Sequence, residues 1–224
     1  MKMPRFRPVW AAAAQAASGL AHAAGGHHAI DDAAILDPGQ CQVETWVDRH
    51  AANDRGLAHV GSACRLGRVE LGLNLDRTRA RAENDVSATG VQAKWSRPLT
   101  DSLSVGLVLG ATWQDRAPGF AGGTVVVPLT WQPHEQWMVH VNVGRDFLNG
   151  SADKDRGGAA VEWAPTPAWS FVAERFLENN GQFWRLGGRW QLNSSVNIDL
   201  SHARSLRGDG PRWWTLGANW VFSR

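Results

Sequence analysis

Apolar and polar residues alternate along most of the chain from residue 41 onward. The clearest segment, residues 69–76, has the sequence Val-Glu-Leu-Gly-Leu-Asn-Leu-Asp, so one face is aliphatic and the other is polar or small. A period of two residues predicts a β-strand with one apolar and one polar face. No segment in this region has a 3.6-residue period, so we expect an all-β fold. Twelve such segments follow one another, near residues 41–49, 57–65, 68–76, 87–96, 102–113, 124–132, 136–145, 157–164, 168–176, 182–192, 195–204 and 212–222.

The connections between the predicted strands are alternately short and long. The short ones lie near residues 66–67, 97–101, 133–135, 165–167 and 193–194. The longer ones are rich in Gly and Asp and lie near residues 50–56, 77–86, 114–123, 146–156, 177–181 and 205–211. Transmembrane barrels have short periplasmic turns and longer outer loops. The pattern therefore predicts a 12-stranded antiparallel up-and-down transmembrane β-barrel over residues 41–222, with both termini on the periplasmic side.

Tryptophan is unusually common, with 13 Trp and no Tyr in 224 residues. Most of these Trp lie on the apolar face of a predicted strand, close to its end. Trp favours the membrane–water interface because its ring is apolar while its N–H still needs a partner. A soluble β-sandwich is the alternative, but it would have to bury these side chains at strand ends rather than in mid-strand. We assign ten of them to two interfacial rings: Trp95, Trp113, Trp131, Trp137, Trp163, Trp169, Trp184, Trp190, Trp214 and Trp220.

The N-terminus has the pattern of a secretory signal. Lys2, Arg5 and Arg7 precede an apolar run, and residues 21–23, Ala-His-Ala, fit the small-residue cleavage rule. We expect residues 1–23 to be a signal peptide and residues 24–40 a periplasmic leader; a soluble N-terminal helix is the alternative. Without the three basic residues, 20 basic residues face 21 acidic ones, so the near-zero charge gives no indication of nucleic-acid binding. The predicted localisation is the bacterial outer membrane.

Two cysteines fit an oxidising compartment. If Cys41 and Cys64 are opposed in an antiparallel hairpin, Val43 faces Ser62 and Val47 faces Ala58. Directly opposed cysteines form a disulfide when the pair is of the close, non-hydrogen-bonded kind. Two free buried thiols are the alternative. A metal site is poorly supported, because neither cysteine has a second sulfur ligand nearby in the sequence.

If the Val, Leu and Trp face meets lipid, the opposite face lines the lumen. Bare charges on the lipid side cost about 2–4 kcal/mol each at mid-membrane, so charged residues belong inside. They line a narrow aqueous pore, or they pair across the lumen and plug it; the sequence leaves both open. A slight acidic excess favours cations weakly. The predicted lumen-lining residues are Glu44, Asp48, His59, Arg65, Glu70, Asp76, Lys94, His140, Glu162, Glu174, Arg185, Arg189 and Asp199.

Two short stretches resemble known families. Residues 214–222, Trp-Thr-Leu-Gly-Ala-Asn-Trp-Val-Phe, resemble the C-terminal strand of bacterial outer-membrane barrels, which implies recognition by the barrel assembly machinery. Such strands usually end on a Phe, whereas in this chain Ser223 and Arg224 follow Phe222. Residues 31–46, with Asp-Asp, Pro-Gly and Val-Glu-Thr-Trp, resemble the start of outer-membrane proteins associated with the MetA pathway of phenol degradation. That resemblance implies transport of small hydrophobic or aromatic compounds, although the cysteine pair is not expected in that family.

Other functions find less support. A lipid enzyme needs a Ser–His pair with an orienting group, and His202 with Ser205 has no third partner in register, so we expect no enzymatic activity. Cleavage after Ala24 would leave Gly-Gly-His, which binds Cu(II) or Ni(II), whereas cleavage after Ala23 spoils that geometry. No cofactor motif is present. We therefore expect a channel or transporter for small solutes, in contact with outer-membrane lipid. A plugged structural or adhesion barrel and metal capture by the leader are the alternatives.

Overall fold

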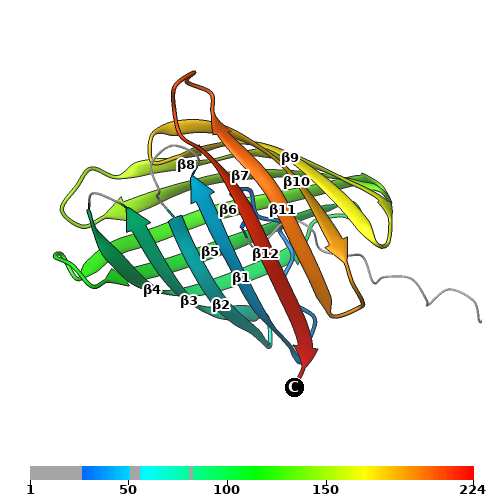
Figure 1. Cartoon of the computed structure of the whole chain (residues 1–224). Helices are drawn as coiled ribbons and strands as arrows, with labels where there is room; N and C mark the ends of the chain where they lie inside the picture. Colours follow the sequence, from blue (N-terminus) through cyan, green and yellow to red (C-terminus); the bar gives the residue numbers. More distant parts are fainter. Residues whose placement is uncertain (1–26, 51–55, 81–82) are drawn as a thin grey trace, which may run out of the picture.

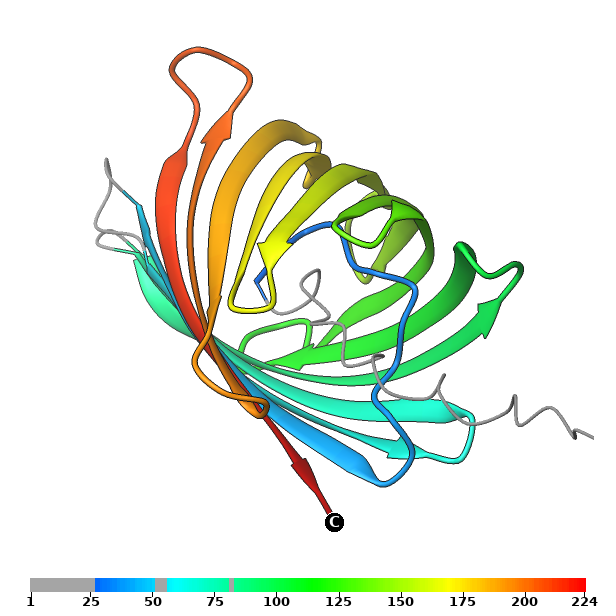
Figure 2. The same ribbon diagram turned by 90° about the vertical axis from the view of Figure 1, so that its right-hand side faces the viewer.

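The computed structural model shows a closed β-barrel and describes residues 27–50, 56–80 and 83–224 (Figures 1 and 2). In chain order the strands are β1 (Gln40–His50), β2 (Gly56–Leu66), β3 (Val69–Ala80), β4 (Glu83–Pro98), β5 (Leu103–Gln114), β6 (Phe120–His134), β7 (Trp137–Leu148), β8 (Lys154–Thr166), β9 (Trp169–Glu178), β10 (Gly181–Gln191), β11 (Val196–Ser205) and β12 (Arg212–Ser223).

Every strand pairs antiparallel with its neighbour in the sequence, and β1 pairs with β12 to close the ring. Closure leaves no unpaired strand edge, because Gln40 faces Ser223 at one end of the seam and His50 faces Trp213 at the other. The predicted 12-stranded antiparallel barrel is thus confirmed. Among the described residues, no helix has the length and apolar character needed to cross a membrane.

Several of the polar stretches predicted to be long loops are partly extensions of the strands. β3 continues to Ala80 and β4 begins at Glu83, where residues 77–86 were expected to form a loop. The backbone ladder does not depend on side-chain polarity, so a strand continues beyond the apolar band wherever ion pairs support it. Arg77 and Arg79 contact Asp85 at 3.0 and 3.3 Å across this hairpin. Between β9 and β10 only Asn179 and Asn180 remain, both with positive φ, as a tight hairpin turn requires.

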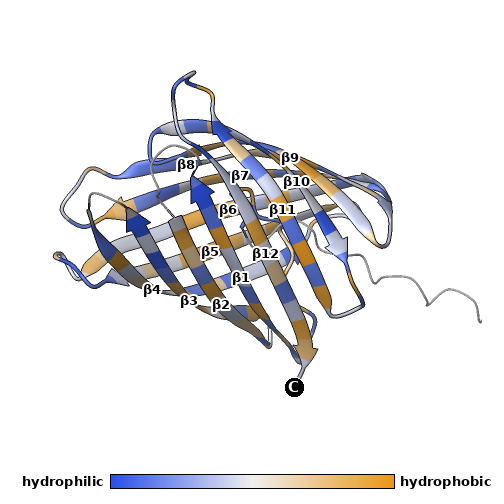
Figure 3. Cartoon of the chain, in the orientation of Figure 1, coloured by the Kyte–Doolittle hydropathy of each residue, from blue (hydrophilic) through white to orange (hydrophobic). Residues whose placement is uncertain are grey.

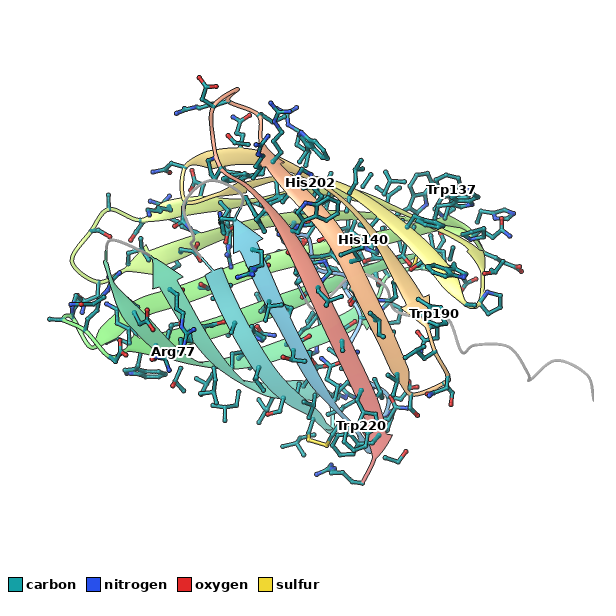
Figure 4. All side chains as sticks on the ribbon, viewed as in Figure 1. Arg77, Trp137, His140, Trp190, His202 and Trp220 are labelled. Atoms are coloured by element: carbon teal, nitrogen blue, oxygen red, sulfur yellow. A yellow bond between two sulfur atoms is a disulfide. The ribbon has the colours of Figure 1, made fainter. Side chains whose placement is uncertain are left out.

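Large apolar side chains are exposed on the outward phase of the strands and form an apolar band. Figure 3 shows apolar and polar residues alternating along the strands. Leu71, Leu73 and Leu75 of β3 are each about half exposed. A soluble protein does not expose so continuous an apolar surface, whereas lipid contact requires it. Trp137, Trp190 and Trp220 lie along the end of the barrel that holds the C-terminus (Figure 4). The ten Trp assigned to the interface all lie on this outward phase.

The disulfide between Cys41 and Cys64 is present and joins β1 to β2. The two Cα atoms lie 4.0 Å apart, and the predicted register, with Val43 opposite Ser62 and Val47 opposite Ala58, is confirmed. The bridge lies at the same end of the barrel as Trp220 (Figure 4). The predicted signal peptide, residues 1–23, lies outside the described residues.

Candidate transport lumen

Residues 27–36, here called the luminal segment, run through the interior of the barrel (Figure 2). Ile30 and Ala33 have no solvent exposure, and His27 and Asp32 are buried. These ten residues of the predicted leader are therefore not a free tail. The described part of it, from His27, folds back into the lumen, because the barrel interior offers partners for the backbone groups and charges that it carries.

The wall of the barrel holds the luminal segment by hydrogen bonds to its backbone. Glu174 of β9 accepts the N–H groups of Ala29 and Ile30 at 3.3 and 3.0 Å. The Thr130 hydroxyl of β6 accepts the N–H of Ala33 at 2.8 Å. Glu70 of β3 accepts the N–H of Leu36 at 2.9 Å, and Arg65 of β2 donates to the Leu36 carbonyl at 2.9 Å. These contacts spread over much of the circumference, so the segment crosses the lumen instead of following one strand.

Ion pairs add a second set of anchors. The Lys94 ammonium of β4 lies 2.9 Å from the Asp31 carboxylate and 3.2 Å from that of Asp32. The Asn142 amide donates to the Asp31 carbonyl at 3.1 Å, and Arg185 donates to the His27 carbonyl. A buried charge is tolerated only when it is paired, so these contacts fix where the segment can lie.

The side of the lumen formed by β8 to β12 is filled. Ile30 packs there against Phe176, Ala203 and Trp213. Arg185 forms an ion pair with Glu174 at 3.0 Å, and its guanidinium lies over the ring of Phe176. Three further contacts complete this side: Arg189 with Asp199 at 2.5 Å, His140 with Glu162 at 3.5 Å, and Phe176 stacked on Phe183. Figure 4 shows His140 inside the barrel wall.

The opposite side, formed by β1 to β7, is open. Most of the strand residues that line a cavity of about 1040 Å³ belong to β1 to β7, and the luminal segment borders it; residues of β8 to β12, among them Arg185, Arg189 and Trp213, line the rest. Its lining includes residues of the turns at the end that holds the C-terminus, Pro167 and Asn193, and residues near the loop end, Arg156 and Glu178. The rings of Trp46 and His59 stack on the cavity wall with their centroids 3.4 Å apart. The His59 Nδ1 atom lies 2.7 Å from the Asp76 carboxylate.

The thirteen predicted lumen residues all lie inside the barrel but fall into three groups. Arg65 lies at the rim beside Leu36. His140, Glu162, Glu174 and Asp199 are buried in the filled side and do not line the cavity. The remaining eight line the open cavity: Glu44, Asp48, His59, Glu70, Asp76, Lys94, Arg185 and Arg189.

Two parts of the lumen were not predicted from the sequence. Asp31 and Asp32 lie inside the barrel, but nothing in a short polar stretch shows that it folds back. Trp46 and Trp213 also point inwards. Their position on the polar phase of β1 and β12 was the signal that could have identified them, because side chains alternate strictly between the two faces.

The chemistry of other candidate groups is limited by the geometry. His202 packs against the outward-facing Trp214, whereas Ser205 is buried on the opposite phase of β11, so the two cannot form a nucleophile–base pair. Within residues 27–50, 56–80 and 83–224, no group of three or more His, Cys, Asp or Glu side chains could hold a metal ion. Asp31 and Asp32 are instead bound to Lys94.

The family model described as "Uncharacterised conserved protein UCP029691" matches residues 12–222. The chain belongs to this family. No curated protein gives a significant match to the sequence. The resemblance of residues 31–46 to the MetA-pathway family is not confirmed by these comparisons.

Solved structures with a similar fold include porins and a transporter. The NanC porin has 8% identity and a TM-score of 0.65, covering 80% of this chain and 98% of its own. The KdgM porin has 8% identity and a TM-score of 0.63, covering 81% and 99%. The Ralstonia pickettii toluene transporter TbuX has 11% identity and a TM-score of 0.50, covering 83% and 89%. At these identities the likeness shows the fold. Together with the apolar exterior of the closed barrel, it places the chain in the bacterial outer membrane.

Proposed function

We propose that this protein is a passive channel for small polar solutes. The observation that carries the proposal is the cavity of about 1040 Å³, whose lining draws on residues near both ends of the barrel. A barrel with a purely structural role has no need for such a space, and its charged side chains would pair across the lumen. Here charges pair on both sides of the lumen, yet a cavity remains, because these pairs and the luminal segment narrow the passage without filling it.

The charges of the cavity favour cations and neutral solutes over anions. Glu44, Asp48 and Asp76 line the wall formed by β1 to β3. Among the described residues, His59 is the one basic side chain that contacts Glu44 and Asp76, at 3.8 and 2.7 Å. Asp48 accepts a hydrogen bond from the neutral Thr215 hydroxyl. The basic residues of the lining, in contrast, are engaged by carboxylates: Lys94 by Asp31 and Asp32, Arg185 by Glu174, and Arg189 by Asp199. Rings or patches of uncompensated carboxylates attract cations to a pore.

The alternative to polar solutes is a hydrophobic or aromatic cargo, which the resemblance of residues 31–46 implies. The toluene transporter shares the fold, but the open cavity of this chain is lined largely by charged and amide side chains. Phe176 and Ala203, which pack with Ile30, do not line the cavity, whereas Trp213 does. We therefore favour polar cargo. We also propose that the protein is not an enzyme and that His27 and His28 act as part of the luminal segment rather than in metal capture.

Planar bilayers test the channel directly. We expect purified, folded protein to give discrete conductance steps with a larger permeability for potassium than for chloride. Folded protein is recognised by its heat-modifiable migration. Protein that is folded by this criterion but gives no conductance, and no swelling of solute-loaded liposomes, would favour the structural or adhesion barrel. Conductance with a preference for chloride would retain the channel but contradict the assignment of the acidic wall.

We propose that assembly begins with β12. Its outward phase ends in Trp220 and Phe222, whose rings lie 4.7 Å apart, and β12 pairs with β1 to close the barrel. This supports recognition of residues 214–222 by the barrel assembly machinery. Replacing Phe222 with Ser should reduce the fraction of heat-modifiable protein in outer membranes of cells, without changing refolding of the purified chain in detergent.

A further inference from the structure

Four arginines lie on the outer face of the barrel at its loop end, within the five adjacent strands from β9 to β1. They are Arg175 of β9, Arg204 of β11, Arg212 of β12 and Arg49 of β1, here called the arginine cluster, and all four are exposed. Arg204 and Arg212 are directly opposite each other in the β11–β12 register. Trp184 lies opposite both Arg175 and Arg204, and Trp214 lies opposite Arg49.

This arrangement costs stability within the protein itself. Like charges directly opposite on paired strands repel each other. The outward phase of β9 to β12 and of β1 carries no Asp or Glu among its described residues, and none of the four arginines has a salt bridge within the described part of the chain. The nearest contacts are neutral: Arg175 donates to the Gln182 amide oxygen at 3.1 Å and Arg204 to the Gly208 carbonyl at 3.5 Å.

At the same loop end, the outward arginines of β3 and β7 are neutralised. Arg77 contacts Asp85 at 3.0 Å, and Arg145 contacts Asp153 and Asp155 at 3.5 and 3.2 Å. The same end of the barrel thus has two kinds of outward arginine. The arginines of β3 and β7 already have carboxylate partners within the protein. The arginine cluster on β9 to β1 instead presents four positive charges to the molecules that surround the barrel.

Along the outer surface, from the arginine cluster towards the middle of the barrel, aromatic and then aliphatic side chains follow the charged ones. His202 lies between two Trp rings, 4.7 Å from that of Trp214 and 5.8 Å from that of Trp184. Figure 4 shows His202 on the wall near the loop end. Beneath these rings Leu186, Leu200 and Leu216 are each more than half exposed. A partner that fits this surface carries anionic groups above and acyl chains below.

We propose that the arginine cluster binds the phosphate groups of a phosphorylated acyl glycolipid in the leaflet at the loop end. The guanidinium fork matches phosphate oxygens in bidentate geometry, which makes Arg the preferred side chain for such groups. In an outer-membrane barrel the longer loops lie on the extracellular side, so the lipid that meets the cluster is a lipid of the outer leaflet. Its acyl chains would lie on Leu186, Leu200 and Leu216, and its phosphates would offset the repulsion between Arg204 and Arg212.

The test compares lipid retention by two variants of the full chain that lose the same net charge. Arg204→Gln/Arg212→Gln removes the opposed pair of the cluster, while Arg77→Gln/Arg145→Gln removes two outward arginines that already have carboxylate partners. Bisphosphorylated lipid A is added to each protein in detergent, and bound lipid is measured by native mass spectrometry. The cluster variant should bind it about 30-fold more weakly than wild type, from the usual contribution of each basic residue beside an anionic lipid surface. The control variant should stay within about threefold of wild type.

Two further arms identify the source of the phosphate. Lipid A from which both phosphates have been removed should bind wild type as weakly as the intact lipid binds the cluster variant. Inorganic phosphate at the same concentration should not displace the bound lipid. Equal losses in the two variants, equal binding of the dephosphorylated lipid, or displacement by inorganic phosphate would each overturn the proposal. Heat-modifiable migration of both variants establishes that they are folded.

Discussion

The carboxylate of Glu174 accepts the backbone N–H of Ile30 at 3.0 Å, although 144 residues separate the two in the chain. Glu174 belongs to the wall of the barrel and Ile30 to the luminal segment inside it. This bond, with the ion pair between Lys94 and Asp31 on the opposite wall, holds the segment across the lumen. The shape of the open cavity, and hence the conductance, therefore depends on a part of the chain that precedes the first strand.

Deletion of residues 27–36 should enlarge the pore. The strands and their ladder stay intact, while the space occupied by the luminal segment becomes open. We expect single-channel conductance in planar bilayers to rise roughly twofold or more, because conductance grows with the open cross-section. Thr130→Ala is the control, since it removes the acceptor for the Ala33 N–H and the contact of Thr130 with His140 but leaves the other anchors of the segment in place. An unchanged conductance after deletion would show that the segment does not limit the passage.

Neutralising the acidic wall should reduce cation preference. In Glu44→Gln/Asp48→Asn, two carboxylates of the cavity lose their charge with almost no change in volume. A unit charge about 10 Å away in water contributes ~0.4 kcal/mol before screening, with opposite sign for a cation and an anion. The potassium-to-chloride permeability ratio, obtained from reversal potentials, should fall roughly threefold.

The matched control for the acidic wall is Asp85→Asn/Asp155→Asn, which removes two carboxylates from the outer face. This variant should keep the wild-type permeability ratio. If it lowers the ratio as much as the luminal variant does, net charge rather than position in the cavity would determine selectivity.

Loss of the disulfide should weaken the barrel without changing its fold. Cys41 and Cys64 are 23 residues apart, and a bridge over such a loop stabilises by about 3 kcal/mol through the entropy of the unfolded chain. The β1–β2 ladder still fixes the register after Cys41→Ser/Cys64→Ser. The urea concentration at which the heat-modifiable form is lost should therefore decrease. Wild-type protein treated with reductant should match the double variant, and equal midpoints for the oxidised and bridge-free forms would contradict this expectation.

Gly158 should not tolerate a side chain. Its φ is +150°, and an added Cβ would lie 2.1 Å from the carbonyl oxygen of Arg175 on the neighbouring strand. Gly158→Ala should lower the free energy of unfolding by ~2 kcal/mol or more, measured by urea titration in detergent. Gly119→Ala is the control, because a Cβ at Gly119 meets no atom within 4 Å, and its effect should stay within about 0.5 kcal/mol. Equal effects of the two substitutions would rule out steric strain as the cause.

The sequence by itself determined the architecture. Each strand can be recognised from a period of two residues, and the predicted and observed ranges differ mainly where polar hairpins extend β3, β4, β6 and β8. The even strand count, the Cys41–Cys64 register and the inward direction of all thirteen charged or His residues follow from the same alternation. These properties are local, because a strand position determines which face a side chain occupies whatever the rest of the chain does.

The tertiary structure decided what the lumen contains. Whether a charge such as Glu174 lines water or is buried depends on what lies across from it, and here that neighbour is a segment without any periodic pattern. Ile30, Asp31 and Asp32 find their partners on β4, β9 and the strands near them only after the barrel has closed. The same holds for the arginine cluster, because Arg49 and Arg212 belong to strands from opposite ends of the chain that meet where the barrel closes. Alternation assigns a residue to a face, but closure of the barrel determines its neighbours.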